Sequence, residues 1–137
     1  MLFYDPSKYL AFELSDNCKS SLKSLFPPVF SKVFCHHITL FFGGIESDFN
    51  VVVNSLQKTN TFEIVGNIVH DEVECFLVEI NKSNHRIDGG RYHITHSISE
   101  NRKPVDSNRI IKETFPGKWN IFNTSIKLSG IVKQIKK

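Results

Sequence analysis

The tripeptide His-Ile-Thr occurs twice in this chain of 137 residues, at His37-Ile38-Thr39 and at His93-Ile94-Thr95. Both copies lie in runs rich in β-branched and aromatic residues, a composition typical of strands. Because successive side chains of a strand point to opposite faces, the His and Thr of each copy share one face. Continued alternation adds Phe41 to the face of the first copy and Ser97 to the face of the second. Two such strands side by side would hold two imidazoles and two hydroxyls over one cleft.

The His and Thr side chains of these strands suit cleavage of a phosphodiester. That reaction needs a base to deprotonate the attacking oxygen and an acid to protonate the leaving oxygen. Histidine, with an ordinary pKa of about 6.5, can do either near neutral pH. The Thr hydroxyls can donate hydrogen bonds to the non-bridging phosphate oxygens. One His-x-Thr is weak evidence, because Thr favours strands, but two copies indicate catalytic side chains at His37, Thr39, His93 and Thr95.

No metal ion or other cofactor is expected, since protein side chains supply the acid, the base and the hydrogen-bond donors. His36 precedes the first motif directly, but adjacent residues of a strand point to opposite faces, so this pair is not expected to chelate a metal. Arg102 and Lys103 can contact a phosphate at the rim of a cleft; an ordinary solvated loop is an equally good interpretation. Phe41, on which a base can stack, and Ser97 complete the predicted substrate-binding residues.

Paired His-hydrophobic-Thr motifs resemble the signature of the 2H phosphoesterase, or LigT-like, superfamily. The segment after the second motif, Ser99-Glu100-Asn101-Arg102-Lys103-Pro104-Val105-Asp106-Ser107-Asn108, is similar to one branch of it. That branch contains myelin 2′,3′-cyclic-nucleotide phosphodiesterase and the cyclic phosphodiesterase domain of fungal tRNA ligases. Its members have a Pro-Val step followed by an acidic or amide residue and a small one. His96 departs from the pattern, since the family usually has an aliphatic residue there, and alternation is expected to place it on the back face of the strand, opposite His93 and Thr95.

The resemblance implies an α+β, bilobal, duplicated fold, in which two antiparallel sheets form a V-shaped cleft with helices outside. It also implies a monomeric, metal-independent hydrolase of nucleotide phosphodiesters next to a ribose hydroxyl, with no obligate protein partner. Small stand-alone members are similar to viral and phage proteins that degrade cyclic-dinucleotide immune messengers, so 2′,3′-cGAMP is the expected substrate. The resemblance suggests His93 as the base and His37 as the acid.

Two other functions remain open on the sequence. Opening of a terminal 2′,3′-cyclic phosphate on RNA is favoured by the segment after the second motif. The second open function is that of a non-catalytic nucleotide-binding module. The His and Thr of both motifs are intact, which argues against it, because an inactive relative would be expected to have lost one of these residues.

The chain is expected to form one α+β domain over residues 1–137, in two related halves of about 1–70 and 71–137. Each half offers a motif strand, a helix, and a strand in which Gly comes before Ile-Val, as an internal duplication would produce. Periodicity and turn residues predict strands over 8–14, 33–42, 61–70, 74–80, 92–98, 119–122 and 124–135, and helices over about 16–26, 48–57 and 109–114. Ser15 or Asp16 is expected to cap the first helix, and a tight turn at Asp71-Glu72 is expected to join the third and fourth strands.

Composition limits the remaining possibilities. With 40% hydrophobic residues and 12% aromatic residues, the chain has the material for a packed core. Its net charge of +3 suits a small phosphorylated ligand and is too weak to indicate binding of long duplex nucleic acid. The three cysteines lack metal-binding spacing, which indicates buried thiols in a reducing compartment. Neither a signal peptide nor an apolar run of membrane-spanning length is apparent, so a cytoplasmic location is expected.

Overall fold

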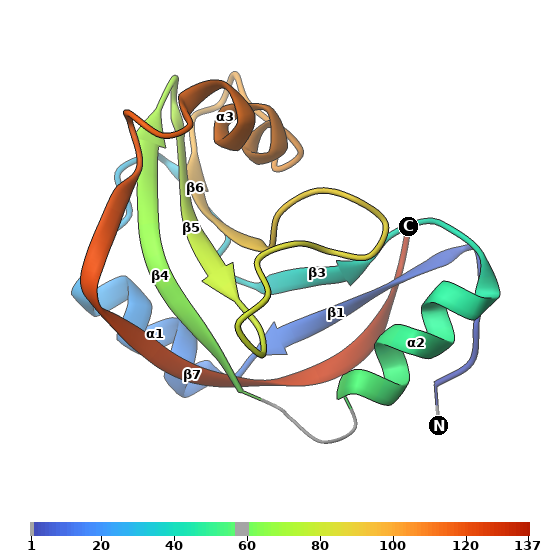
Figure 1. Ribbon diagram of the computed structural model, residues 1–137. Coiled ribbons are helices and arrows are strands. Elements are labelled where there is room, and N and C mark those ends of the chain that lie inside the picture. The colour runs from blue at the N-terminus through green and yellow to red at the C-terminus, as the bar shows by residue number, and fades with distance from the viewer. Residues whose placement is uncertain (1, 57–60) are drawn as a thin grey trace.

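The computed structural model describes residues 2–56 and 61–137. These residues form a mixed fold in which three helices pack on strands (Figure 1). The strands are β1 (Lys8–Leu14), β2 (Lys32–Val33), β3 (His37–Phe41), β4 (Thr61–His70), β5 (Val73–Glu79), β6 (His93–Ile98) and β7 (Asn120–Lys136). The helices are α1 (Asp16–Leu25), α2 (Glu46–Leu56) and α3 (Asp106–Thr114). The predicted end of the second helix at Gln57 lies outside the described residues.

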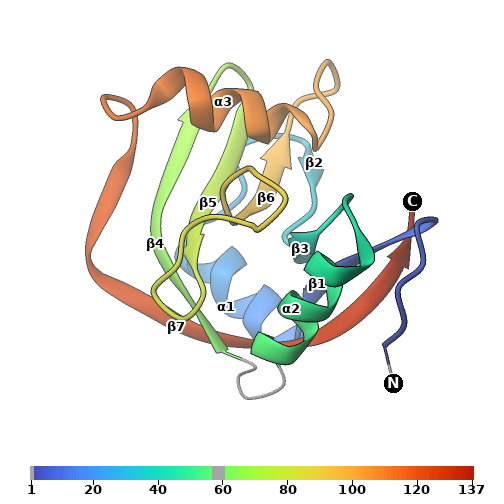
Figure 2. The same ribbon diagram turned by 45° about the vertical axis from the view of Figure 1, so that its right-hand side comes forward.

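All the described strands belong to one antiparallel sheet of seven strands, in the order β2-β6-β5-β4-β7-β1-β3. The sheet curls into a half-barrel (Figures 1 and 2). The prediction of an α+β protein is confirmed, whereas the prediction of two separate sheets is wrong. The reason is β7, a single strand of 17 residues that replaces the two shorter strands expected in this region. Its first part pairs with β4 and its second part with β1, so it joins what would otherwise be two sheets.

The main hydrophobic core lies between one face of the sheet and helices α1 and α2. Alternate residues of β1, including Phe12, pack there against Cys18 and Leu22 of α1. Helix α1 begins where predicted, because the Ser15 hydroxyl accepts a hydrogen bond of 3.2 Å from the Cys18 N–H and so caps the first turn. Phe49 is among the residues that α2 contributes to the same core. These two helices therefore lie on the outer side of the sheet, as expected.

Helix α3 packs on the opposite face of the sheet. Its Ile110 and Ile111 form a second, smaller cluster with Cys75 and Leu77 of β5. Strand β5 is buried on both faces because α3 covers one face and the main core covers the other. The expectation that all helices lie outside is therefore wrong for α3, which lies on the face that carries the His and Thr of the second motif.

The single strand expected over residues 33–42 is interrupted between β2 and β3. Cys35 has a φ of 50°, which breaks the extended conformation. The backbone N–H groups of Phe34 and Cys35 donate hydrogen bonds of 2.9 Å to the carbonyls of His96 and Thr95, while Leu14 N–H donates to the His36 carbonyl. The chain thus passes from beside β6 to beside β1, and this crossing draws the two motif strands, β3 and β6, together.

Two smaller predictions agree with the structure. The turn at Asp71-Glu72 joins β4 to β5, and both residues have positive φ angles, of 49° and 65°, as a tight hairpin turn requires. The three cysteines are buried free thiols. As for a membrane span, α1, α2 and α3 are each too short or too polar to provide one.

Candidate functional site

The His and Thr of both motifs lie on the same face of the curled sheet. Ile38 and Ile94, the middle residues of the two motifs, are both completely buried in the main core. Because neighbours in a strand point to opposite faces, the flanking His and Thr residues point away from that core. All four of these side chains remain partly exposed. The sequence therefore predicted correctly that the four side chains share one face.

Each motif strand carries a β-bulge directly after its Thr. In β3, Ala11 pairs with Thr39 and Leu10 with Phe41, which leaves Leu40 as the extra residue. In β6, Cys75 pairs with Thr95 and Glu74 with Ser97, which leaves His96 as the extra residue. A bulge shifts the alternation of the strand by one position, so every later side chain changes face. The two bulges occupy the same position relative to the two motifs.

The bulges overturn the predicted orientation of Phe41 and Ser97. Phe41 is buried in the main core, where its ring makes an edge contact with Phe49. Ser97 is completely buried and donates a hydrogen bond of 2.5 Å to Glu74. Neither side chain can contact a ligand that lies over the two histidines. His96, whose back-face position was predicted, is also completely buried and bonds to the Phe26 carbonyl at 2.7 Å.

His37 is surrounded by a tyrosine and a second histidine. The Tyr9 hydroxyl lies 3.4 Å from Nε2 of His37, and Nδ1 of His36 lies 3.1 Å from Nδ1 of His37. Burial, followed by the nearby charges of His36 and His93, lowers the pKa of His37 to about 4. His37 is therefore neutral at pH 7. The expectation that His36 and His37 diverge is wrong, because His36 lies outside β3 and strand alternation does not extend to it.

His93 is held in one orientation by the backbone. Its Nδ1 lies 3.0 Å from the carbonyl oxygen of Arg91, which fixes the proton on Nδ1 and leaves a lone pair on Nε2. Burial lowers the pKa of His93; the bond to the Arg91 carbonyl opposes this shift, and the positive charge of Arg86 adds to it. Both motif histidines thus favour the neutral form in the free protein.

The hydroxyl of Thr95 contacts the first turn of α3. Its Oγ1 lies 2.9 Å from Oγ of Ser107 and 3.4 Å from the carbonyl oxygen of Pro104. Ser107 is completely buried, so its hydroxyl holds that of Thr95 from the interior side of the site. Thr39, in the other motif, is partly buried opposite Ala11 of β1. The two threonines therefore have different surroundings although their motifs match.

An aromatic surface lies beside His37. The bulge at Leu40 turns Phe42 onto the motif face, where the residue is 47% exposed and its ring lies 5.5 Å from the ring of Tyr9. The Tyr9 ring in turn lies 5.6 Å from the imidazole of His37. The ammonium group of Lys137 lies 4.7 Å from the centre of the Phe42 ring. We call Tyr9, Phe42 and Lys137 the aromatic platform.

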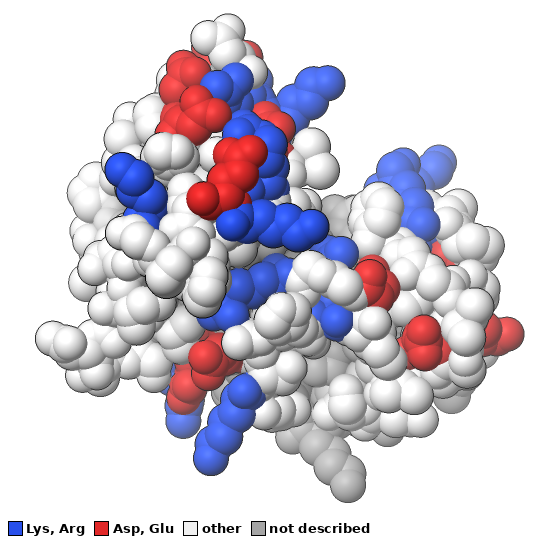
Figure 3. Space-filling model, turned by 45° about the horizontal axis from the view of Figure 1, so that its top comes forward, with Lys and Arg blue, Asp and Glu red and all other residues white. Residues whose placement is uncertain are grey.

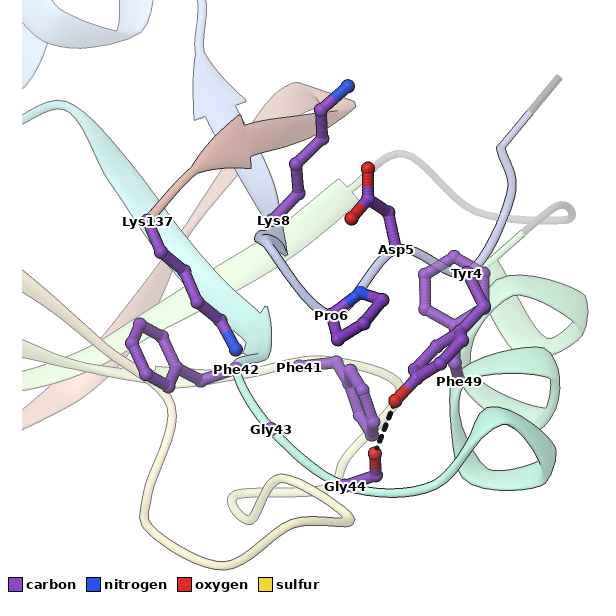
Figure 4. A pocket seen from close by; sticks show the side chains of 10 residues that line it. All are labelled: Tyr4, Asp5, Pro6, Lys8, Phe41, Phe42, Gly43, Gly44, Phe49 and Lys137. Carbon is purple, nitrogen blue, oxygen red and sulfur yellow. Dashed lines mark hydrogen bonds between the residues drawn. The ribbon is translucent and has the colours of Figure 1, made fainter.

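A small pocket adjoins this platform (Figure 4). It has a volume of about 80 Å³ and includes Phe42 and Lys137 but neither motif histidine. Gly44 lies against Phe41 at the floor of the pocket, and the Tyr4 hydroxyl donates a hydrogen bond of 2.9 Å to the Gly44 carbonyl. The pocket is too small to hold a nucleotide, so it extends the platform rather than forming a separate binding site.

The two predicted cationic residues have different settings. Arg102 bonds to Asp71 at 2.7 Å and lies 3.5 Å from Glu72, so the β4–β5 turn neutralises it. Lys103 is exposed and precedes Pro104, whose carbonyl approaches Thr95, so it lies at the rim of the motif face. Lys and Arg side chains also gather in the hollow between the part of the molecule that carries α3 and the remainder (Figure 3).

Several residues beside the motifs were not singled out for a role at the site. Arg91 lies two positions before His93, and strand alternation alone would have placed it on the same face. Its buried Nε has no hydrogen-bond partner among the described residues, and its guanidinium lies 5.0 Å from the centre of the Trp119 ring. Phe42 and Arg86 carried no such signal, because their placement depends on a bulge and on a loop.

The described residues contain no group of three His, Cys, Asp or Glu side chains close enough together to hold a metal ion. Comparison with protein-family models, with curated proteins and with solved structures finds no match for this chain.

Proposed function

We propose that this protein is a metal-independent phosphodiesterase of the 2H type, which cleaves a nucleotide phosphodiester next to a ribose hydroxyl. The observation that carries the proposal is that Ile38 and Ile94 enter one core, leaving the His and Thr of both motifs on one face of a curled sheet. Contacts between strands β3 and β6 support the proximity of the two histidines, since His37 begins β3 and His93 begins β6.

In the proposed reaction the neighbouring ribose hydroxyl attacks the phosphorus. One histidine removes the proton of that hydroxyl, and the other donates a proton to the departing oxygen, which leaves as an alcohol. The products are a cyclic phosphate and the released alcohol. Thr39 and Thr95 donate hydrogen bonds to the non-bridging oxygens and hold the phosphate for in-line attack.

Resemblance to the family assigns the base to His93 and the acid to His37. The pKa values suit either histidine as the base, because a base must start neutral and burial lowers the pKa of both. The acid must carry a proton, and a bound phosphate supplies the negative charge that raises the pKa of a nearby histidine.

The surroundings of His37 support the proposal of a nucleotide substrate. A nucleobase can stack on the exposed ring of Phe42, and Lys137 above that ring can contact an anionic group of the same ligand. We propose a cyclic dinucleotide such as 2′,3′-cGAMP, whose 2′–5′ linkage leaves a neighbouring 3′-hydroxyl that can attack. Cleavage of such a messenger would serve immune evasion, as in the similar viral and phage proteins.

A second candidate is opening of a 2′,3′-cyclic phosphate at an RNA end. The contact between Ser107 and Thr95 favours it, because Ser107 belongs to the segment that resembles cyclic phosphodiesterases of RNA repair. In this reaction water replaces the ribose hydroxyl as the nucleophile.

A substrate panel tests the proposal. The purified protein is incubated with 2′,3′-cGAMP, a 3′,3′-linked dinucleotide, 2′–5′ oligoadenylate and RNA that ends in a cyclic phosphate. We expect cleavage of 2′,3′-cGAMP through a cyclic-phosphate product. Exclusive opening of the RNA cyclic phosphate would favour the second candidate, and binding without cleavage of any substrate would indicate a nucleotide-binding module.

A deoxy analogue identifies the nucleophile. In this analogue, hydrogen replaces the 3′-hydroxyl beside the 2′–5′ linkage of 2′,3′-cGAMP. It should bind yet resist cleavage at that linkage, because nothing remains to attack the phosphorus. Cleavage at the normal rate would show that water is the nucleophile.

A further inference from the structure

The loop between β5 and β6 holds a charged pair that joins the ends of the two motif strands. This loop lies in the hollow of the curled sheet, in front of β3 in Figure 1, and ends at His93. Within it, Nε of Arg86 donates a hydrogen bond of 2.9 Å to Asp88. Only 16% of the Arg86 side chain and 7% of the Asp88 side chain is exposed. Both charges are thus largely removed from solvent.

Asp88 ties this loop to the end of β3. Its second carboxylate oxygen accepts hydrogen bonds from the backbone N–H groups of Phe42 at 2.9 Å and Gly43 at 3.2 Å. Phe42 and Gly43 directly follow the first motif strand, while the loop directly precedes the second. One carboxylate therefore sets the position of Arg86 relative to both motif strands.

The loop is shaped to hold the guanidinium of Arg86. Nε of Arg86 also donates a hydrogen bond of 2.9 Å to the Gly89 carbonyl, and the backbone N–H of Arg86 donates one of 3.1 Å to the Gly90 carbonyl. Gly90 has a φ of 83°, and a Cβ at this position would lie 3.3 Å from a terminal nitrogen of Arg86. Gly90 therefore leaves space directly beside the fork of the guanidinium.

The terminal nitrogens of Arg86 are free to bind a ligand. Nε is satisfied twice, but neither Nη atom makes a hydrogen bond within residues 2–56 and 61–137, and neither is a buried unpaired atom there. Asp88 is shared between Arg86 and two backbone amides, so the positive charge of the guanidinium is only partly offset. That charge also acts on His93, whose pKa it lowers. Arg102, in contrast, contacts two carboxylates.

We propose that Arg86 is a phosphate-binding residue of the same site and that Asp88 is its positioning residue. The proposal rests on the proposed function and adds a cation to it. A guanidinium fork matches two oxygens of a phosphate, so the free Nη atoms can bind the phosphate while the motif histidines transfer protons. The simpler alternative is an ion pair that only folds the loop, and it predicts effects on stability alone.

Direct phosphate binding tests the proposal without requiring catalysis. Inorganic phosphate is titrated into ¹⁵N-labelled protein, and the Nε resonance of Arg86 and the ring resonances of His93 are followed by NMR. Both should shift with one dissociation constant. Arg86→Gln should weaken this binding by about tenfold or more, the usual effect of losing a charged hydrogen-bond donor. The matched control is Arg109→Gln, which removes a more exposed arginine paired with Asp71 and Glu113 and should leave phosphate binding unchanged.

A double-mutant cycle tests the role of Asp88. If Asp88 acts through Arg86, Asp88→Asn should weaken phosphate binding in the wild type but should weaken it no further in Arg86→Gln. Arg86→Lys keeps the positive charge but lacks the guanidinium fork, so it should retain part of the affinity for phosphate. It therefore serves as a second variant in case Arg86→Gln does not fold. Phosphate binding by folded Arg86→Gln with wild-type affinity would overturn the proposal. So would a wild-type titration in which the Arg86 Nε resonance does not move.

The two proposals fail separately. If phosphate shifts the Arg86 resonance but the protein cleaves no nucleotide, the proposed function fails and the phosphate site stands. If the protein cleaves nucleotides and Arg86→Gln leaves kcat/KM unchanged, the function stands and the assignment of Arg86 is wrong.

Discussion

The hydroxyl of Tyr9 lies 3.4 Å from Nε2 of His37, although the two residues are 28 positions apart in the chain. Tyr9 belongs to β1 and His37 to the neighbouring strand β3, and both side chains project from the motif face. The same tyrosine ring lies 5.5 Å from the ring of Phe42. Tyr9 therefore connects a proposed acid-base residue with the surface on which a base is proposed to stack.

Removal of the Tyr9 hydroxyl tests this connection. Tyr9→Phe should lower kcat by about three- to tenfold, since a hydrogen bond contributes about 0.5–1.5 kcal/mol, and should leave KM nearly unchanged. Tyr9→Leu should also raise KM, because the ring that supports Phe42 is lost. Tyr4→Phe is the matched control, since it removes a tyrosine hydroxyl that bonds to Gly44 at the far side of the adjoining pocket. Unchanged kinetics in Tyr9→Phe would mean that Tyr9 does not position His37.

The two threonines should matter less than the histidines. Thr39→Ala and Thr95→Ala should each lower kcat, but by less than loss of either motif histidine, because each Thr contributes one hydrogen bond to the phosphate. Ser107→Ala should reproduce part of the Thr95→Ala effect, since Ser107 holds the Thr95 hydroxyl at 2.9 Å. Steady-state kinetics on the cleaved substrate measures all three. A Thr variant as slow as a His variant would contradict the roles assigned here.

Protein stability should fall as His37 becomes protonated. The pKa of His37 is lowered from 6.5 to about 4 in the folded protein, so folding favours the neutral form. The stability that this provides is complete above pH 6.5 and is lost as the pH falls from 6.5 towards 4. The loss is about 3 kcal/mol, at about 1.4 kcal/mol for each pKa unit.

Urea unfolding at pH 7 and at pH 4.5 measures this effect. His37→Gln should lose less stability between the two pH values than the wild type, because it removes the titrating group. His70→Gln, which removes a histidine from the far end of β4, should behave like the wild type. Equal losses in the wild type and in His37→Gln would show that the pKa of His37 is not lowered.

Activity should be insensitive to chelation. EDTA should leave turnover unchanged, because protein side chains supply the acid, the base and the hydrogen-bond donors. Initial rates with and without EDTA measure this directly. Loss of activity on chelation, with recovery on addition of a divalent ion, would point to metal ligands such as the adjacent nitrogens of His36 and His37.

Local patterns were sufficient for most elements of the fold. The Asp71-Glu72 turn and the alternation within each motif depend on neighbours in sequence, and both were predicted correctly. Of the two caps that the sequence offered for the first helix, Ser15 and Asp16, the structure uses Ser15. The single sheet was not predicted, because the continuity of β7 depends on which strands it joins. A strand of 17 residues and two shorter strands have nearly the same local composition. The internal duplication stays a prediction, and the matching bulges after Thr39 and Thr95 favour it.

The bulges limited what the sequence could reveal about the site. Strict alternation put Phe41 and Ser97 beside the histidines, and one extra residue in each strand turned both side chains to the opposite face. The same shift exposed Phe42, which the sequence had not marked. Bulges are specified by pairing with another strand, so the sequence of the motif strand alone does not reveal them. Arg86 was missed because its position depends on hydrogen bonds between Asp88 and the two residues that follow β3.

Turnover of His37→Ala and His93→Ala on the dinucleotide that the wild type cleaves tests the two-histidine mechanism most directly. Each variant should fold, since both side chains lie outside the main core, and each should lose about two to four orders of magnitude in kcat. His70→Ala, the matched control, should keep wild-type kcat. Near-wild-type turnover in folded His37→Ala or folded His93→Ala would contradict the two-histidine mechanism.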